Sequence, residues 1–112
     1  MDKTYTVKIT RHAEESLREI ARYIAYDLLE PQTAVQLIEK LRDAADSLSQ
    51  MPERIMLTPE EPWHSQGIHR MLVKNYYVYF WINKDAALVQ ITDVIYARSD
   101  QPRRLEEMQL EN

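Results

Sequence analysis

The segment that decides the fold runs from Trp63 to Asp100 and reads WHSQGIHRMLVKNYYVYFWINKDAALVQITDVIYARSD. It contains three short runs rich in β-branched and aromatic residues, which are Ile68–Val73, Tyr76–Ile82 and Leu88–Ala97. Turn-forming residues separate these runs at positions 74–75 and 83–85. Because strands joined by such short polar turns pair with their neighbours, we expect a three-stranded antiparallel meander.

The first half of the chain has helical periodicity after one short strand. Tyr5–Ile9 alternates apolar and polar residues, which predicts a strand. After Thr10, a residue suited to a helix N-cap, apolar residues recur every three or four positions as far as Leu28. Pro31 fits the first turn of a second helix, which we expect to end before Pro52.

These elements predict an α+β protein with the order β-α-α-β-β-β, in which a helical hairpin packs on a mainly antiparallel sheet. At 112 residues the chain is the size of one domain, spanning positions 1–112. Positions 52–67 hold three prolines and the only glycine, and should form an irregular loop. The tail from Gln101 is expected to form a short helix that carries Leu105, Met108 and Leu110.

Composition and motifs restrict the possible functions. The chain lacks cysteine, which excludes thiolate chemistry and cysteine-ligated metal sites. Its three histidines are scattered, and it has no glycine-rich loop, so we expect neither a metal nor a cofactor. The net charge of −4 argues against general nucleic-acid binding. The N-terminus has no apolar run of signal-peptide length, so we expect a cytoplasmic location.

The order and spacing of several short motifs resemble the RelE/ParE toxin superfamily of type II toxin–antitoxin systems. The resemblance covers nearly the whole chain. The motifs are LREIARYI at 17–24, LSQMP at 48–52, GIHR at 67–70, YYVYF at 76–80 and YARSD at 96–100. The resemblance implies a toxin that is neutralised by an antitoxin protein. It also implies one of two activities: RelE-like members cut messenger RNA on the ribosome, and ParE-like members inhibit DNA gyrase.

If the chain is a ribonuclease, the resemblance assigns the catalytic role to Arg70, Tyr96 and Arg98. RNA cleavage through the 2′-hydroxyl needs a base, an acid and cations around the phosphorane. However, Tyr77 replaces the arginine of the RelE-like third strand, and the loop at 52–61 has no lysine. We therefore favour a ParE-like toxin that acts by binding. The alternatives are a RelE-like ribosome-dependent mRNA endoribonuclease and a degenerate, non-toxic binding module.

Strand alternation also predicts a partner-binding surface. It places Tyr77, Tyr79 and Trp81 on the face of the sheet away from the helices. The same alternation groups them with Arg70, Tyr96 and Arg98, with Val89, Ile91 and Ile95 facing the core. Asp93 would then point inward, which indicates either a bend in the last strand or a different alternation. Three readings of the aromatic side chains stay open: cross-strand packing beneath the C-terminal tail, stacking on nucleic-acid bases, and a surface for the antitoxin.

Overall fold

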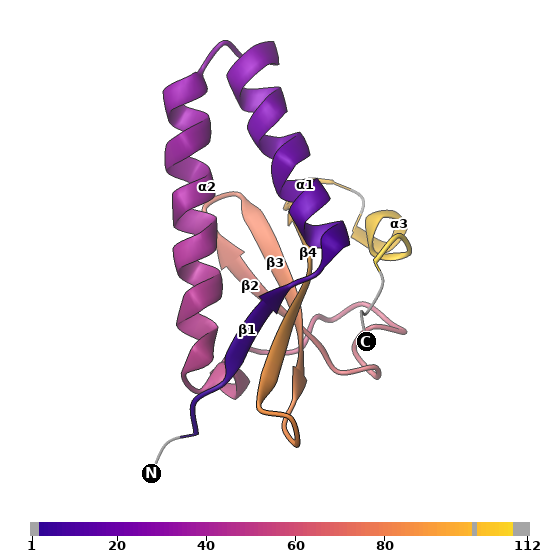
Figure 1. The fold of residues 1–112 in the computed structure, drawn as a ribbon. Helices are drawn as coiled ribbons and strands as arrows, with labels where there is room; N and C mark the ends of the chain where they lie inside the picture. Colours follow the sequence, from indigo (N-terminus) through magenta and orange to yellow (C-terminus); the bar gives the residue numbers. More distant parts are fainter. Residues whose placement is uncertain (1–2, 100, 109–112) are drawn as a thin grey trace.

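The structure of the protein is a computed structural model that describes residues 3–99 and 101–108. Its elements in chain order are β1 (Thr6–Ile9), α1 (Arg11–Arg22), α2 (Pro31–Asp46), β2 (Ile68–Val73), β3 (Tyr76–Asn83), β4 (Leu88–Tyr96) and α3 (Gln101–Leu105). The predicted order of one strand, two helices and three strands is confirmed (Figure 1). The predicted tail helix is present as α3, with Met108 just beyond it, whereas Leu110 lies outside the described residues.

The helical hairpin forms as the sequence predicts. Thr10 caps α1, because its side-chain oxygen accepts a hydrogen bond from the backbone N–H of Ala13 at 3.2 Å. A π-helical turn, Tyr23–Asp27, extends α1, and Pro31 then occupies the first turn of α2. In the described part of the chain, no helix is both long enough and apolar enough to cross a membrane.

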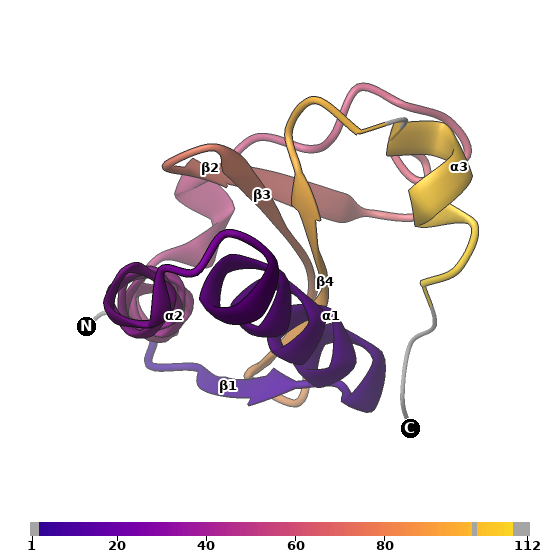
Figure 2. The same cartoon turned by 90° about the horizontal axis from the view of Figure 1, so that it is seen from above.

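The described residues form a four-stranded sheet in the order β1-β4-β3-β2. The strand β1 runs parallel to β4, and the other pairs are antiparallel. Seen along the hairpin, α1 and α2 cover one face of the sheet, while α3 and the loop before β2 lie toward the other (Figure 2). That loop also follows the edge of β2, because Thr58 N–H donates to Ile68 C=O at 2.8 Å.

Each face of the sheet has its own hydrophobic core. The larger core lies between the sheet and the hairpin and includes Leu17, Leu41, Leu48, Val78, Phe80, Val89, Ile91 and Val94. The smaller core lies on the opposite face and consists of Ile68, Tyr79, Ile95 and Leu105, with Trp63, Tyr77, Trp81 and Met108 packed around it. The predicted alternation of β2 and β3 is therefore confirmed.

The predicted alternation of β4 is wrong in its second half, because the strand contains a β-bulge. Tyr79 pairs with Asp93 and Phe80 pairs with Ile91, so Thr92 is an extra residue on β4. Val89 and Ile91 face the hairpin as expected, but Ile95 joins the smaller core on the other face. Tyr96 consequently faces the hairpin instead of grouping with Tyr77 and Tyr79. Of the two explanations offered for Asp93, a bend or a different alternation, the structure shows a different alternation that begins at the bulge.

Candidate functional site

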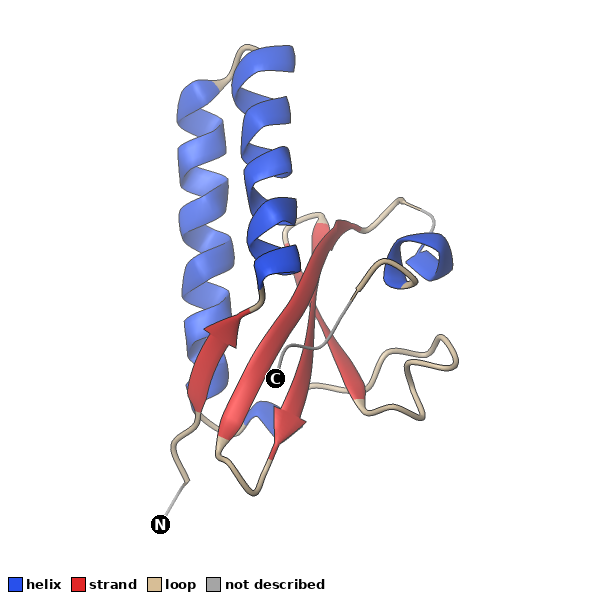
Figure 3. Cartoon of the chain, turned by 45° about the vertical axis from the view of Figure 1, so that its right-hand side comes forward, coloured by secondary structure: helices blue, strands red, loops and turns tan. Residues whose placement is uncertain are grey.

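An open groove lies between the helical hairpin and the end of the sheet. The hairpin extends past the sheet, and this overhang leaves its inner side uncovered (Figure 1 and Figure 3). The groove has a volume of ≈ 950 Å³. Its lining includes the apolar side chains of Ile20, Ile24, Leu28, Leu37 and Val94, and the aromatic side chains of Tyr23, Tyr76 and Tyr96. The overhang thus presents an apolar concave surface of the kind that binds partner segments.

Three tyrosines give the groove its aromatic character. Tyr76 and Tyr96 come from the facing ends of β3 and β4, and their rings meet edge to face with centroids 5.5 Å apart. Tyr23 reaches the groove from the π-helical turn. Burial raises the pKa of Tyr76, and the neighbouring Tyr96 and Tyr23 raise it further. The protonated hydroxyl of Tyr76 is able to donate a hydrogen bond to a bound partner.

Charged side chains complete the lining of the groove. Lys40 comes from α2, Lys74 from the β2–β3 turn and Arg104 from α3, while Glu19 and Glu30 come from the hairpin. A partner with one apolar face and both acidic and basic side chains would complement this lining.

The free end of the hairpin carries exposed apolar side chains next to the groove. Tyr26 is 73% exposed and Leu29 is 81% exposed. Tyr23 and Leu28 are also more than half exposed, and both line the groove. Large exposed apolar side chains that adjoin one another mark an interaction surface more often than isolated ones do. The groove and the hairpin end are therefore one continuous surface.

The structure does not bring the three predicted catalytic residues together. Arg70 lies on the face of the smaller core, where its guanidinium stacks 4.0 Å from the ring centroid of Tyr77. Its Nη1 also lies 3.2 Å from a carboxylate oxygen of Glu60. Tyr96 faces the hairpin groove on the other side of the sheet, and Arg98 is exposed in the turn after β4. Arg70 and Tyr96 therefore cannot act on one phosphate in this conformation.

The predicted partner-binding residues share one face, but they differ in accessibility. Tyr77 and Trp81 are partly exposed at the edge of the smaller core. Tyr79 is 0% exposed, and its hydroxyl donates a 2.6 Å hydrogen bond to Oε1 of Gln101. The helix α3 therefore covers Tyr79, as in the packing reading of these aromatics. Contact between a partner and Tyr79 would require α3 to move away.

The sequence interpretation missed the groove because the groove depends on how far the hairpin overhangs the sheet. A signal was present in the apolar stripe of the first helix, which continues through Ile24 to Leu28. The sheet covers only the nearer part of that stripe. Across the described residues, no three histidine or acidic side chains are placed to hold a metal ion.

Comparisons with known proteins agree with this fold. The chain is similar to a protein of the chromosomal ParDE toxin–antitoxin system from P. aeruginosa, with a TM-score of 0.70 and 18% identity over 86% of this chain and 99% of that one. It also resembles a chain of the RelBE2 toxin–antitoxin complex from Mycobacterium tuberculosis, with a TM-score of 0.58 and 22% identity over 86% and 97% of the two chains.

A third similar structure is a mutant of toxin RelE from E. coli in the free state, with a TM-score of 0.61 and 12% identity over 90% of this chain and 92% of that one. At these identities the likeness concerns the fold. No curated protein matches the chain significantly. A family model described as the ParE toxin of the type II toxin–antitoxin system parDE matches residues 7–101. The chain therefore belongs to the ParE toxin family of type II toxin–antitoxin systems.

Proposed function

We propose that this toxin acts by binding a protein target of the DNA gyrase class, and that a cognate antitoxin neutralises it by occupying the hairpin groove. The observation that carries the proposal is the continuous apolar surface formed by the groove and the hairpin end. Membership of the ParE family supports the choice of target. A surface of this kind suits recognition of a protein and requires no catalytic residues.

The shape of the groove fits an amphipathic helix. Such a helix would lay its apolar face on Ile20, Ile24 and Leu37, and its flanks would meet the charged side chains of the lining. Acidic side chains on one flank would pair with Lys40 and Lys74. These pairs would favour the correct orientation of the antitoxin more than they would add affinity.

The overlap between the groove and the hairpin end explains neutralisation. Tyr23 and Leu28 belong to both surfaces. If the target binds the hairpin end, an antitoxin segment in the groove would therefore cover part of the target surface. Toxin bound to antitoxin could not engage its target at the same time.

The geometry supports binding over RNA cleavage. Arg70, one of the two arginines of the predicted catalytic set, stacks on Tyr77 and pairs with Glu60. Glu60 would also repel an approaching phosphate. The loop that precedes β2 supplies no lysine in place of Arg70.

One pair of variants tests the role of the groove. Leu28 lines the groove and is 51% exposed, whereas Leu72 is 60% exposed on β2 and lies outside the groove lining. Each protein would be co-expressed with the cognate antitoxin and purified through a tag on the toxin. We expect Leu72→Asp to retain the antitoxin and Leu28→Asp to lose it. Equal retention by both variants would contradict the proposal.

A growth assay separates the toxin from a degenerate module. Induced expression of the wild-type chain without antitoxin is expected to arrest growth. If the protein accumulates in folded form and the cells grow normally, the chain is a non-toxic binding module.

A further inference from the structure

The bulge in β4 decides which side chains reach the groove. With Thr92 as the extra residue, Val94 and Tyr96 face the hairpin and line the groove. Without the bulge, strict alternation from Val89 and Ile91 would turn Ile95 to the hairpin and Tyr96 to the opposite face. The aromatic pair of Tyr76 and Tyr96 exists only with the bulge in place.

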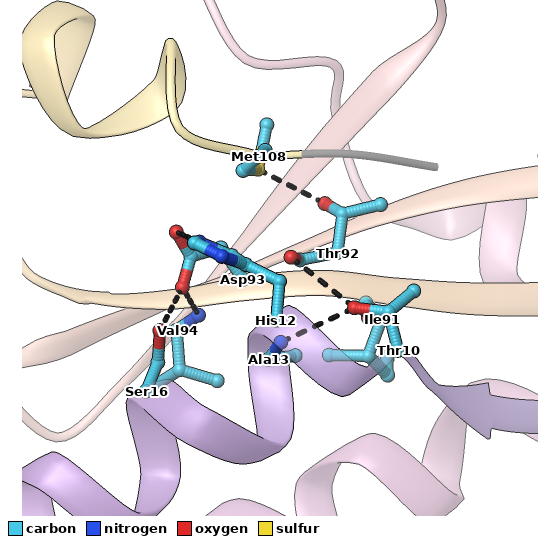
Figure 4. Close-up of polar contacts among 9 residues, drawn as sticks. All are labelled: Thr10, His12, Ala13, Ser16, Ile91, Thr92, Asp93, Val94 and Met108. Atoms are coloured by element: carbon cyan, nitrogen blue, oxygen red, sulfur yellow. Dashed lines mark hydrogen bonds and ion pairs between the residues drawn. The ribbon is translucent and has the colours of Figure 1, made fainter. Parts of the chain in front are cut away.

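Asp93, next to the bulge, is the centre of a buried polar cluster (Figure 4). The residue is 1% exposed. Its Oδ1 accepts hydrogen bonds from the hydroxyl of Ser16 at 2.5 Å and from the backbone N–H of Val94 at 2.7 Å. Its Oδ2 lies 3.0 Å from Nε2 of His12. Burial raises the pKa of Asp93, while the hydrogen bond from Ser16 and the nearby His12 oppose that shift.

The cluster contains a serine, a histidine and an aspartate, but it is not arranged for nucleophilic catalysis. A serine nucleophile needs its hydroxyl hydrogen-bonded to the histidine that removes its proton. Here the hydroxyl of Ser16 donates to Asp93, and His12 also contacts Asp93. Ser16 is nearly buried as well, at 5% exposure. The carboxylate is the hub of the cluster, and its role is therefore structural.

The start of α1 holds β4 on both sides of the bulge. Before the bulge, the backbone N–H and the hydroxyl of Thr10 each donate to Ile91 C=O at 3.0 Å. After the bulge, His12 and Ser16 contact Asp93. Because His12 and Ser16 are four residues apart, they project from the same face of α1. In regular pairing Asp93 would take the place of Val94 opposite Val78, among the apolar side chains of the larger core.

We propose that Ser16 and His12 act through Asp93 as positioning residues, which fix the bulge in β4 and thereby hold Tyr96 in the groove. A buried carboxylate without partners is strongly unfavourable. In the bulged pairing the carboxylate of Asp93 has hydrogen-bond partners, so the cluster favours this pairing over the regular one. The relevance of Tyr96 to antitoxin binding rests on the proposed function, whereas the control of its position does not.

The test follows the contact between Tyr76 and Tyr96 by NMR, as the nuclear Overhauser effect between their rings. Asp93→Asn keeps an oxygen that accepts from Ser16 and Val94, and we expect it to retain the ring contact. Asp93→Leu removes the acceptor and keeps the branch at Cγ, and we expect it to lose the contact. Val89→Ala serves as the matched control, because Val89 is 0% exposed near the other end of β4. It should reduce stability and keep the contact.

The proposal is wrong if Asp93→Leu folds and keeps the ring contact, or if Asp93→Asn folds and loses it. If Asp93→Leu does not fold, Ser16 provides the test. Ser16→Ala should shift the balance between bulged and regular pairing by about tenfold toward regular pairing, and Ser16→Thr, which restores a hydroxyl, should reverse that shift. An unchanged Tyr96 spectrum in Ser16→Ala would also overturn the proposal. If Leu28→Asp and Leu72→Asp retain the antitoxin equally while the NMR results are as expected, the proposed function is rejected and the role of Asp93 stands.

Discussion

Replacing Tyr79 by phenylalanine tests whether α3 seals the outer face of the sheet. The side chain is fully buried, and its hydroxyl donates to Gln101 at 2.6 Å. Without that hydroxyl, the side-chain oxygen of Gln101 loses its donor in a site that is 8% exposed. An unsatisfied buried acceptor costs about 1–3 kcal/mol, and the position of Gln101 near the chain end favours the lower limit. We expect Tyr79→Phe to reduce the free energy of unfolding by about 1 kcal/mol at pH 8.

The same variant should change the response to alkaline pH. Burial raises the pKa of Tyr79 from 10.0 to about 12 in the folded state. Between these values the folded state holds a proton that the unfolded state releases, so wild-type stability falls as pH rises above about 10. The loss amounts to about 1.4 kcal/mol at pH 11, because one pKa unit corresponds to that energy. The phenylalanine variant lacks this loss, so the two stabilities should become equal near pH 11.

Urea unfolding of both proteins between pH 8 and pH 11.5 measures this difference. Tyr26→Phe is the control for loss of a phenol, because Tyr26 is 73% exposed, and it should leave stability at pH 8 unchanged. A constant difference between wild type and Tyr79→Phe across the whole pH range would refute the claim that α3 encloses Tyr79.

Three further predictions concern stability, and urea unfolding tests each of them. Leu48→Ala, at a fully buried position, should lower the free energy of unfolding by about 2–5 kcal/mol. A smaller loss would indicate that the core around α2 collapses to fill the space. Gly67→Ala should lower the free energy of unfolding by about 1–2 kcal/mol, because φ is +86° there and a residue with a Cβ is strained at this angle. The added Cβ would meet the Trp81 ring at 3.6 Å, which is an ordinary contact distance. An unchanged stability would contradict the left-handed conformation. Glu14→Gln removes a partly exposed ion pair with Arg42, so it should cost less than about 1 kcal/mol at pH 7. The pKa of Glu14 is lowered by Arg42, so its contribution is present above pH 4.5 and disappears as pH falls through the folded pKa; a variant effect that persists at pH 2 would contradict this assignment.

The features that the sequence predicted are those that depend on local patterns. The cap at Thr10, the start of α2 at Pro31 and the alternation of β2 and β3 each follow from a few neighbouring residues, and the structure contains all of them. The family resemblance depended on the order of short motifs, and that order can be read from one sequence.

The features that the sequence could not predict depend on contacts between distant segments. The bulge at Thr92 depends on donors from α1, which lies more than seventy residues earlier in the chain. The burial of Tyr79 depends on Gln101 and on the apolar side chain of Leu105. Strand alternation assumes a regular ladder, so it placed Tyr96 on the wrong face and grouped it with Arg70. Tyr96 instead lines the hairpin groove.

The central claim, that this toxin binds its target and does not cut RNA, has one direct test. Purified protein would be titrated against DNA gyrase in a supercoiling assay, and the same preparation would be added to ribosomes that are translating a labelled messenger RNA. We expect supercoiling to stop at near-stoichiometric toxin while the messenger RNA stays intact. Position-specific cuts in the messenger RNA that disappear in Arg70→Ala and Tyr96→Phe, with supercoiling unaffected, would contradict the claim.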